Sequence, residues 1–370
     1  MKVTITGQDG FIGFHLYNSI KYKYPKIELI DFRKNYFEES DKIDQIFSST
    51  DIIIHLAGLN RHDDANYLFD QNIILGKKII DSIIRINFKG KLIFASSIQQ
   101  KDDNAYGVSK RKSVENFFNA SSKYGFTFIN LVIPNVFGPF CKPNYNSFIA
   151  TFCYNSLHKI KNIVKKNKDV PLIFIDNLVH QIIQKVKVDS TDEFKVIEDI
   201  NIKVKEVKNI IDDFNQVYIK KGSIPDLNNS FKINLFNTFH SYIEPENFFP
   251  RKLRLINDDR GSFAEIIKSS SKGQVSFSVT KPGHIRGNHF HTRKIERFLV
   301  LEGEAEINIK KIGSNKRFTF NLSGKNPCYV DMQVWYTHNI KNIGDKNLIT
   351  LFWINEFYNE NDSDTFFEKV

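Results

Sequence analysis

Hydrophobic positions in the first two-thirds of the chain follow two alternating periods. Short runs that are apolar almost throughout, such as residues 51–56, are typical of parallel strands buried on both faces. Longer segments with apolar residues three and four positions apart, such as residues 72–86, predict helices. We expect strands at residues 2–6, 27–30, 51–56, 91–96 and 126–133, and helices at residues 11–20, 72–86 and 105–124. This alternation predicts an α/β Rossmann domain with a doubly wound parallel sheet.

The pattern changes near residue 244. From residue 256 onward, short apolar segments are separated by Gly, Asn, Asp and Pro, and we expect no long helix. The predicted strands are residues 274–280, 296–301, 304–310, 318–322 and 348–354. Short strands separated by turns predict an antiparallel sandwich or barrel. We therefore predict a first domain at residues 1–243, in which residues 142–243 include a lobe that covers the substrate, and a second domain at residues 244–370.

Composition excludes several classes of protein. The chain has 370 residues, 41% hydrophobic and 25% charged, which is typical of a globular protein with two or three domains. No apolar run approaches the roughly 20 residues of a membrane span, and the first residues lack the apolar segment of a signal peptide. Three cysteines are too few for a disulfide framework, so we expect a cytoplasmic protein.

The net charge of +10 allows three interpretations. A basic chain can bind nucleic acid or an anionic membrane, or its local field can attract a nucleotide. No nucleic-acid-binding motif accompanies the charge, so we interpret it as a solvated, lysine-rich surface. We expect neither nucleic acid nor membrane as a partner.

A glycine-rich segment joins the first predicted strand to the first predicted helix. Gly7, Gly10 and Gly13 are spaced so that the chain can turn tightly, approach a pyrophosphate and pack helix on strand. The helix N-terminus, at Phe11 and Ile12, offers free N–H groups and a partial positive charge to phosphates. The segment therefore predicts a dinucleotide-binding site.

The end of the second predicted strand should contact the adenosine ribose. Asp31 there would hold the 2′-hydroxyl of NAD, whereas Arg33 would accommodate the 2′-phosphate of NADP. Both residues could also belong to a solvated loop. We favour NADP, bound through Arg33.

Three polar residues predict a hydride-transfer site. Tyr106 and Lys110 lie four residues apart on one face of a predicted helix. A neighbouring ammonium favours the phenolate and lowers the phenol pKa, so that Tyr106 can exchange a proton with a sugar hydroxyl or ketone. Ser97 ends the preceding strand and can hydrogen-bond the same oxygen. We predict that all three are catalytic and that Tyr106 and Lys110 also contact the cofactor.

These segments resemble the extended short-chain dehydrogenase/reductase family over roughly residues 1–240. The likeness includes residues 6–13, His55-Leu56-Ala57-Gly58, Asn72, Ser97, Tyr106, Lys110 and residues 134–139. The resemblance implies cofactor contacts at Leu56 and Ala57 and a nucleotide-sugar substrate. Ile98 and Gln99 stand where the family's 4,6-dehydratases carry Asp-Glu, so elimination is not expected, and Val132 stands where many members have Arg.

Four potential metal ligands follow in the C-terminal region. His289, His291 and Glu296 fit the spacing Gly-x5-His-x-His-x4-Glu-x6-Gly, and His338 falls on a later predicted strand. His289 and His291 alternate along a strand, so both side chains face one side of the sheet. Three imidazoles and one carboxylate suit zinc, and also Fe, Ni or Mn.

This spacing resembles the first motif of the cupin family, which implies an all-β cupin barrel that binds a metal. In the second motif, Gln333 and Trp335 stand in place of the usual Pro and Gly. This departure affects the geometry of the turn and not the predicted ligand His338. Tyr336, His284 and Arg286 are near the ligands in sequence, but the sequence does not identify an acid and a base among them.

The chain resembles the CapF/WbjC group of bifunctional bacterial capsular polysaccharide enzymes. The resemblance lies in the order of a reductase followed by a cupin and in the segments at residues 55–61, 140–147 and 336–340. The resemblance implies a role on the route to UDP-N-acetyl-L-fucosamine. The cupin would invert C3 of a UDP-2-acetamido-2,6-dideoxy-4-hexulose, a UDP-linked 4-keto-6-deoxy amino sugar. The reductase would then reduce C4 with NADPH to give UDP-2-acetamido-2,6-dideoxy-L-talose. Because the C4 ketone acidifies the C3 proton, its reduction would fix the new stereocentre.

Candidate substrate contacts lie in the segment after residue 140. They are Lys142, Asn144, Tyr145 and Asn146, and a structural turn around Pro143 is the other interpretation.

Two other functions stay open. One is a nucleotide-sugar 4-epimerase or ketoreductase whose cupin is purely structural. The other is a non-enzymatic NADP-binding scaffold, which the retention of Tyr106 and Lys110 disfavours. By analogy with cupins that dimerise through sheet edges, we expect a homodimer.

Overall fold

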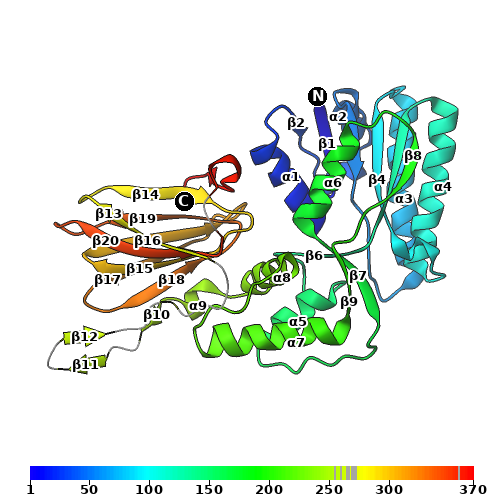
Figure 1. Ribbon diagram of the computed structural model, residues 1–370. Helices are drawn as coiled ribbons and strands as arrows, with labels where there is room; N and C mark the ends of the chain where they lie inside the picture. Colours follow the sequence, from blue (N-terminus) through cyan, green and yellow to red (C-terminus); the bar gives the residue numbers. More distant parts are fainter. Residues whose placement is uncertain (254–255, 259–260, 264–266, 268–272, 357–358) are drawn as a thin grey trace. The chain divides into compact units, whose positions relative to one another are not determined.

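The computed structural model describes residues 1–370 except 254–255, 259–260, 264–266, 268–272 and 357–358 (Figure 1). The chain divides into two compact units, residues 1–151 with 166–204 and residues 152–165 with 205–370. The domain boundary expected between residues 243 and 244 stays a prediction. Among the described residues, no helix has both the length and the apolar character needed to cross a membrane.

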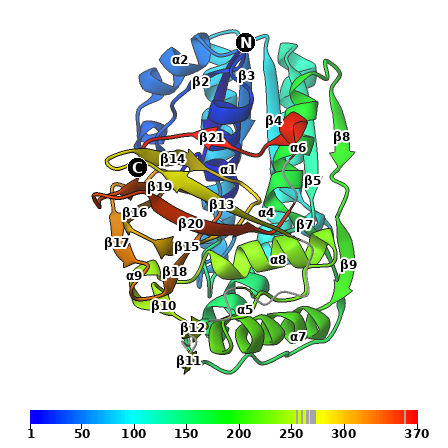
Figure 2. The same ribbon diagram turned by 60° about the vertical axis from the view of Figure 1, so that its left-hand side comes forward.

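The first unit is built on a six-stranded parallel sheet in the order β2-β1-β3-β4-β5-β8 (Figure 1 and Figure 2). Its strands are β1 (Lys2–Thr6), β2 (Glu28–Ile30), β3 (Ile52–His55), β4 (Lys91–Ser97), β5 (Thr127–Ile133) and β8 (Asp192–Lys195). The chain leaves β1 for β2 on one side and reaches β3 on the other, so a crevice forms at the carboxyl ends of β1 and β3. The predicted Rossmann fold is confirmed.

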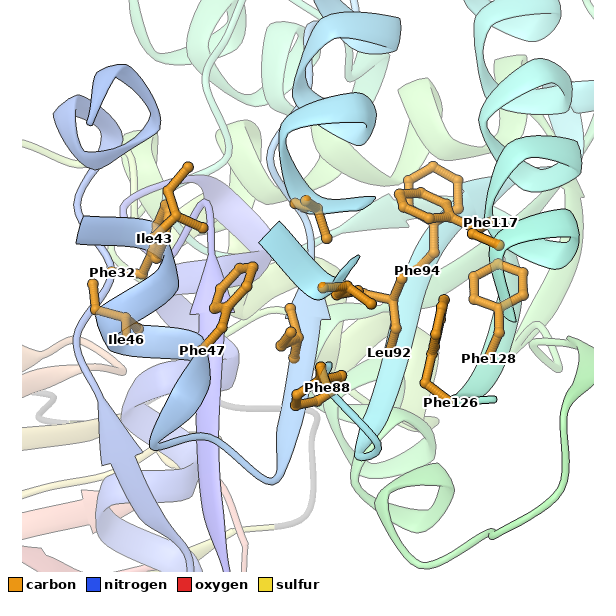
Figure 3. Packing of buried hydrophobic residues seen from close by; sticks show 14 of the residues in the cluster. Phe32, Ile43, Ile46, Phe47, Phe88, Leu92, Phe94, Phe117, Phe126 and Phe128 are labelled. Carbon is orange, nitrogen blue, oxygen red and sulfur yellow. The ribbon is translucent and has the colours of Figure 1, made fainter. Parts of the chain in front are cut away.

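Helices cover both faces of this sheet. They are α1 (Phe11–Lys23), α2 (Ser40–Ser48), α3 (Ala65–Arg85), α4 (Ala105–Tyr124) and α6 (Ile175–Val186). Phe47 from α2 and Phe117 from α4 pack with Leu92, Phe94 and Phe128 from the strands in one apolar core (Figure 3). Helix α1 is joined to α6 by an ion pair between Lys23 and Asp176 at 3.2 Å.

Capping residues set the ends of the two longest helices. Helix α3 begins seven residues before the expected position because the Asp64 carboxylate accepts hydrogen bonds from the N–H groups of Asn66 and Tyr67. Helix α4 has the predicted bounds: Asn104 caps its start, and Gly125, with φ 74°, ends it in the left-handed region. Asn104 therefore starts the helix immediately before Tyr106 and Lys110.

The remaining elements are smaller. They are a three-stranded sheet in the order β6-β7-β9 (Asn135–Phe137, Asp169–Phe174, Ile200–Lys203), the helices α5 (Phe148–Leu157), α7 (Val204–Phe214), α8 (Ser230–His240) and α9 (Pro245–Phe248), and the short helical segments η1 (Lys34–Glu38), η2 (Ile98–Lys101), η3 (Asn215–Lys220) and η4 (Glu360–Asp362).

The second unit contains two five-stranded antiparallel sheets, in the orders β10-β18-β15-β20-β13 and β17-β16-β19-β14-β21, and a β11-β12 hairpin. The strands are β10 (Arg251–Lys252), β11 (Ile256–Asp258), β12 (Gly261–Phe263), β13 (Gln274–Thr280), β14 (Ile285–Phe290), β15 (Glu296–Glu302), β16 (Glu304–Lys311), β17 (Arg317–Ser323), β18 (Cys328–Met332), β19 (Tyr336–Asn342), β20 (Leu348–Ile354) and β21 (Phe366–Phe367). The antiparallel β domain is confirmed. A closed cupin barrel is a narrower statement and stays a prediction.

Buried polar contacts join α8 to the strands of the second unit. The Gln333 side-chain amide donates to the carbonyl oxygens of His240 at 2.8 Å and Ile243 at 3.0 Å. Arg297 on β15 makes two hydrogen bonds, of 2.8 and 3.0 Å, to Asp331 on β18. Gln333, one of the two departures from the cupin motif, therefore holds the C-terminal end of α8.

Candidate functional site

A cavity of about 470 Å³ lies in the first unit, at the carboxyl ends of β1, β3 and β4. Predicted site residues that line it are Gly7, Gly10, Phe11, Ile12, Gly13, Leu56, Ser97, Tyr106, Lys142, Tyr145 and Asn146. Arg33, Ala57, Lys110 and Asn144 do not line it. The fold therefore brings the glycine-rich segment, the tyrosine and most of the candidate substrate contacts to one cavity.

The glycine-rich segment packs so closely against neighbouring backbone that it needs residues without a Cβ. Gly7 has φ 79°, and a Cβ on it would lie 2.7 Å from the Ala57 nitrogen. A Cβ on Gly13 would lie 2.0 Å from the Gly7 carbonyl oxygen. Ala57 therefore packs behind the loop. At the start of α1, Gly10 supplies no capping side chain, so first-turn N–H groups can bind an anion.

Arg33 lies beyond the end of β2, where the adenosine ribose was expected. Its guanidinium lies 3.4 Å from Asp9 and 3.5 Å from Asp31. The second Asp31 oxygen accepts a hydrogen bond from the Tyr17 hydroxyl at 2.7 Å, and burial together with this bond raises the pKa of Tyr17 to about 12. Both oxygens of Asp31 therefore have partners within the protein, whereas Arg33 is half exposed.

Tyr106, Ser97 and Lys110 meet where β4 and α4 come together. The Lys110 Nζ lies 5.7 Å from the centre of the Tyr106 ring and donates to the Ala95 carbonyl oxygen at 2.8 Å. The side chain of Asn72 packs beside them and donates to the Ser109 hydroxyl at 3.0 Å. Tyr106 and Lys110 thus share one face of α4, where Tyr106 lines the cavity and the Lys110 ammonium donates to the Ala95 carbonyl on β4.

The expected lowering of the Tyr106 pKa is not found. Burial raises the pKa of Tyr106 to about 12, and a hydrogen bond with Ser97 opposes this only in part. Burial also lowers the pKa of Lys110 to about 8. The physical reason is that both groups are desolvated, and the Lys110 ammonium points to a backbone carbonyl and not to the phenol.

The loop at residues 60–61 contacts Tyr145 in the loop at residues 140–147. The Asn60 N–H donates to the Tyr145 hydroxyl at 3.4 Å, and Arg61 donates to the Tyr145 carbonyl oxygen at 3.2 Å. The Lys142 Nζ lies 5.6 Å from the centre of the Tyr145 ring. Asn144 has φ 55°, and its N–H donates to the Thr151 hydroxyl at 3.0 Å, so its backbone supports the turn, and its substrate contact stays a prediction.

Further residues line the cavity that were not predicted as site residues. They are Asp9, Gly58, Asn60, Ala95, Ser96, Gln99, Ile133, Pro134, Asn135, Val136, Phe140, Cys141, Ser147, Phe148, Ile149 and Leu172. Many of them fall in segments that carried the family resemblance, and this resemblance could have identified them as site residues. Leu172, on β7, has no such signal and is brought to the cavity by the fold alone.

The second unit gathers the four predicted metal ligands. One nitrogen or oxygen from each of His289, His291, Glu296 and His338 lies within 4.8 Å of the others. Glu296 Oε2 lies 3.3 Å from His291 Nε2 and 2.9 Å from His338 Nε2. These three atoms are buried and lack a hydrogen bond of normal geometry within the described part of the chain. Three imidazoles and one carboxylate that close to one another are a donor set typical of zinc, so the residues fit a metal.

The three histidines reach the cluster from β14, the residue just after it, and β19. Burial and the other two imidazoles lower the pKa of His289 to about 3, which keeps it neutral, as a metal ligand must be. The Nδ1 of His291 lies 2.6 Å from the Asp364 carbonyl oxygen and that of His338 3.3 Å from the Tyr336 carbonyl oxygen. These contacts direct both Nε2 atoms toward Glu296.

Trp335, the second departure from the cupin motif, lies in the turn before His338. Trp335 has φ 61°, in the left-handed region that favours glycine. Its N–H donates to the His291 carbonyl oxygen at 2.7 Å, and its ring stacks on Phe290 with centroids 5.5 Å apart. A buried tryptophan thus occupies a backbone conformation that favours glycine.

The other three residues near the ligands differ in exposure. Tyr336 is buried, which raises its pKa to about 12. Arg286 donates to Thr280 at 2.9 Å, and His284 is exposed beside the Pro282 carbonyl oxygen. Their positions do not select an acid or a base.

Two family models match the chain. Residues 3–196 match the NAD dependent epimerase/dehydratase family, and residues 256–366 match the Polysaccharide biosynthesis C-terminal domain.

Relatives cover nearly the whole chain. A UDP-2-acetamido-2,6-beta-L-arabino-hexul-4-ose reductase from Pseudomonas aeruginosa is 29% identical over 99% of this chain and 98% of its own. The crystal structure of the capsular polysaccharide assembling protein CapF from Staphylococcus aureus is 31% identical, with 100% of both chains covered and a TM-score of 0.63. RMD from Pseudomonas aeruginosa, solved with NADPH, shares the fold alone, at 16% identity over 58% of this chain and 82% of its own (TM-score 0.53). The predicted resemblance to CapF is confirmed.

Proposed function

The chain belongs to the NAD dependent epimerase/dehydratase family, and from this we propose that it is a bifunctional nucleotide-sugar enzyme. Its first domain would reduce C4 of a UDP-2-acetamido-2,6-dideoxy-4-hexulose with NADPH, and its metal-binding domain would invert C3 beforehand. The product would be UDP-2-acetamido-2,6-dideoxy-L-talose, for surface polysaccharide synthesis. The full-length relative named as a UDP-sugar hexulose reductase supports the substrate class.

The observation that carries the reductase proposal is that Tyr106 and Ser97 line the same cavity as the glycine-rich segment. NADPH, when bound, would supply hydride to C4 of the sugar. Tyr106 would donate its proton to the C4 oxygen, which becomes a hydroxyl, and Ser97 would hydrogen-bond that oxygen. Its raised pKa keeps Tyr106 protonated, as a proton donor for reduction must be.

The observation that carries the metal proposal is the cluster of four ligand atoms in the second unit, three of which are buried and lack a hydrogen bond of normal geometry among the described residues. His289, His291, Glu296 and His338 would hold one divalent ion, of which zinc fits best. A bound divalent ion would act as a Lewis acid beside a carbonyl group. The protein's own residues bring the ligands together and keep water from three of them, because those three are buried.

One experiment tests both activities. The protein is incubated with a UDP-2-acetamido-4-keto-6-deoxyhexose and NADPH in deuterated water. We expect NADPH oxidation and one solvent deuterium at C3, because the base removes the original proton and solvent supplies its replacement. Absence of NADPH oxidation would refute the reductase proposal. Oxidation without label at C3 would refute the epimerase proposal and favour a ketoreductase with a structural metal domain.

The preference for NADP is tested at Arg33. Replacing Arg33 with Ala should lower kcat/KM for NADPH by about 10- to 100-fold, because a charged hydrogen-bonding pair with the 2′-phosphate is lost. The value for NADH should change little. Lys34→Ala is the matched control, since Lys34 is an exposed cation next to Arg33. Steady-state kinetics with both cofactors measure the effect, and equal losses with NADPH and NADH would contradict this assignment.

The pH profile of reduction should depend on Lys110. Its ammonium exists below a pKa of about 8 and is lost above it, whereas Tyr106, with a pKa of about 12, stays protonated. We therefore expect kcat for reduction to fall as the pH rises through about 8. Lys110→Arg, whose guanidinium does not titrate in this range, should lack this alkaline fall. A wild-type rate that stays flat to pH 10 would exclude the role of Lys110.

The other expectations from the sequence stay predictions. They are the homodimer, the cytoplasmic location, the absence of nucleic-acid and membrane partners, and the identity of the metal as zinc.

A further inference from the structure

The last residues of the chain lie against the strands that carry the histidine ligands. Strand β21 pairs antiparallel with β14, so that Phe367 is opposite His289 and Phe366 is opposite Phe290 (Figure 2). Glu368 donates its N–H to the Asn288 carbonyl oxygen at 2.9 Å, and its own carbonyl oxygen accepts from the Thr337 hydroxyl. The segment of residues 362–369, here called the C-terminal segment, thus contacts both ligand-bearing strands, β14 and β19.

One contact reaches a ligand directly. The Asp364 carbonyl oxygen lies 2.6 Å from His291 Nδ1, and both groups are buried. In the neutral ring, a proton on Nδ1 lets His291 donate to this carbonyl and leaves a lone pair on Nε2, which lies 3.3 Å from Glu296 Oε2. The Asp364 carbonyl therefore selects the tautomer and the ring orientation that a metal needs.

Asp364 itself is held by the residues that follow His291. Its carboxylate accepts hydrogen bonds from the Thr292 hydroxyl at 2.6 Å, the Thr292 N–H at 3.2 Å and the Arg293 N–H at 2.9 Å. Its backbone has φ 43°, in the left-handed region, which costs energy for a residue other than glycine. A buried carboxylate with three donors maintains this conformation and so keeps the carbonyl beside His291.

We propose that Asp364 is a positioning residue for the metal site: it anchors the C-terminal segment on the β14–β15 turn and thereby orients His291 for coordination. This inference rests on the proposed metal site and names a residue 73 positions from the ligand that it orients. Outer partners of metal-bound histidines usually contribute about 10- to 100-fold in metal affinity.

The test measures zinc affinity of the full chain by competition with a chromophoric chelator. Asp364→Ala should weaken zinc binding by about 10- to 100-fold. Asp364→Asn keeps an oxygen for the Thr292 hydroxyl but places an amide where the carboxylate accepts from Arg293, so it should lose less. Asp362→Ala is the matched control. Asp362 lies on the same C-terminal segment and forms an ion pair with Arg293, but it is exposed and does not contact His291. The zinc affinity of the Asp362→Ala protein should stay within about twofold of wild type.

A second readout separates orientation from folding. Long-range proton–nitrogen NMR spectra of the histidine rings should show a proton on His291 Nδ1 in wild type and a mixture of tautomers in the metal-free Asp364→Asn protein. Unfolding of the metal-free variants shows whether the β domain persists. Equal zinc affinity in wild type and Asp364→Ala, or equal losses in Asp364→Ala and Asp362→Ala, would overturn the inference while the metal site stands. A wild-type protein that binds no zinc would overturn both.

Discussion

Replacing Tyr106 with Phe is expected to lower kcat for C4 reduction by about 10²- to 10⁴-fold, the usual contribution of a positioned general acid. The phenol of Tyr106 lines the cavity and hydrogen-bonds with Ser97, and Phe keeps its ring but has no proton to give to the C4 oxygen. NADPH binding should be nearly unchanged. The measurement is NADPH oxidation at saturating substrate, together with a separate titration of cofactor binding.

The matched control is Tyr124→Phe, which removes the same hydroxyl from the last residue of α4, away from the cavity. It should reduce substrate at the wild-type rate. If Tyr106→Phe also retained this rate, a different residue would donate the proton, and the proposed role of Tyr106 would be wrong.

The second large effect is expected at the metal cluster. His338→Ala removes a buried imidazole that lies 2.9 Å from Glu296, so zinc affinity should fall by more than about 100-fold, the upper range for loss of an outer partner alone. Incorporation of solvent deuterium at C3 should be lost with the metal. Chelator competition measures the first effect, and mass spectrometry of the sugar nucleotide measures the second.

His284→Ala serves as the control, because His284 is an exposed histidine that precedes β14 and is not one of the four ligands. It should bind zinc as wild type does. A His338→Ala protein that loses zinc but still labels C3 at the wild-type rate would assign the metal a structural role and would place the C3 chemistry on groups other than the metal.

Local sequence patterns were enough to predict several elements that position the two candidate sites. The bounds of α4 matched because Asn104, the apolar spacing and Gly125 all act within the helix itself. The glycine-rich segment and the alternation of His289 and His291 are also local, since they depend on backbone geometry over a few residues. Helix α3 was predicted too short because its start depends on the Asp64 side chain and not on apolar spacing.

Properties that depend on distant groups could not be predicted in this way. The Tyr106 pKa follows from burial in the folded unit, and local spacing to Lys110 predicted the opposite direction. The contact of Asn60 with Tyr145 joins residues 85 positions apart, and no periodicity reports it.

The sequence by itself therefore determined the Rossmann sheet, the antiparallel β domain and the residue types of both sites, because burial and backbone preference act over short distances along the chain. Only the tertiary structure decided which nitrogen of His291 faces Glu296, how Gln333 holds α8, and how strongly burial shifts the pKa of Lys110. Each of these depends on packing between segments far apart in sequence, and hydrogen bonding and desolvation act through space.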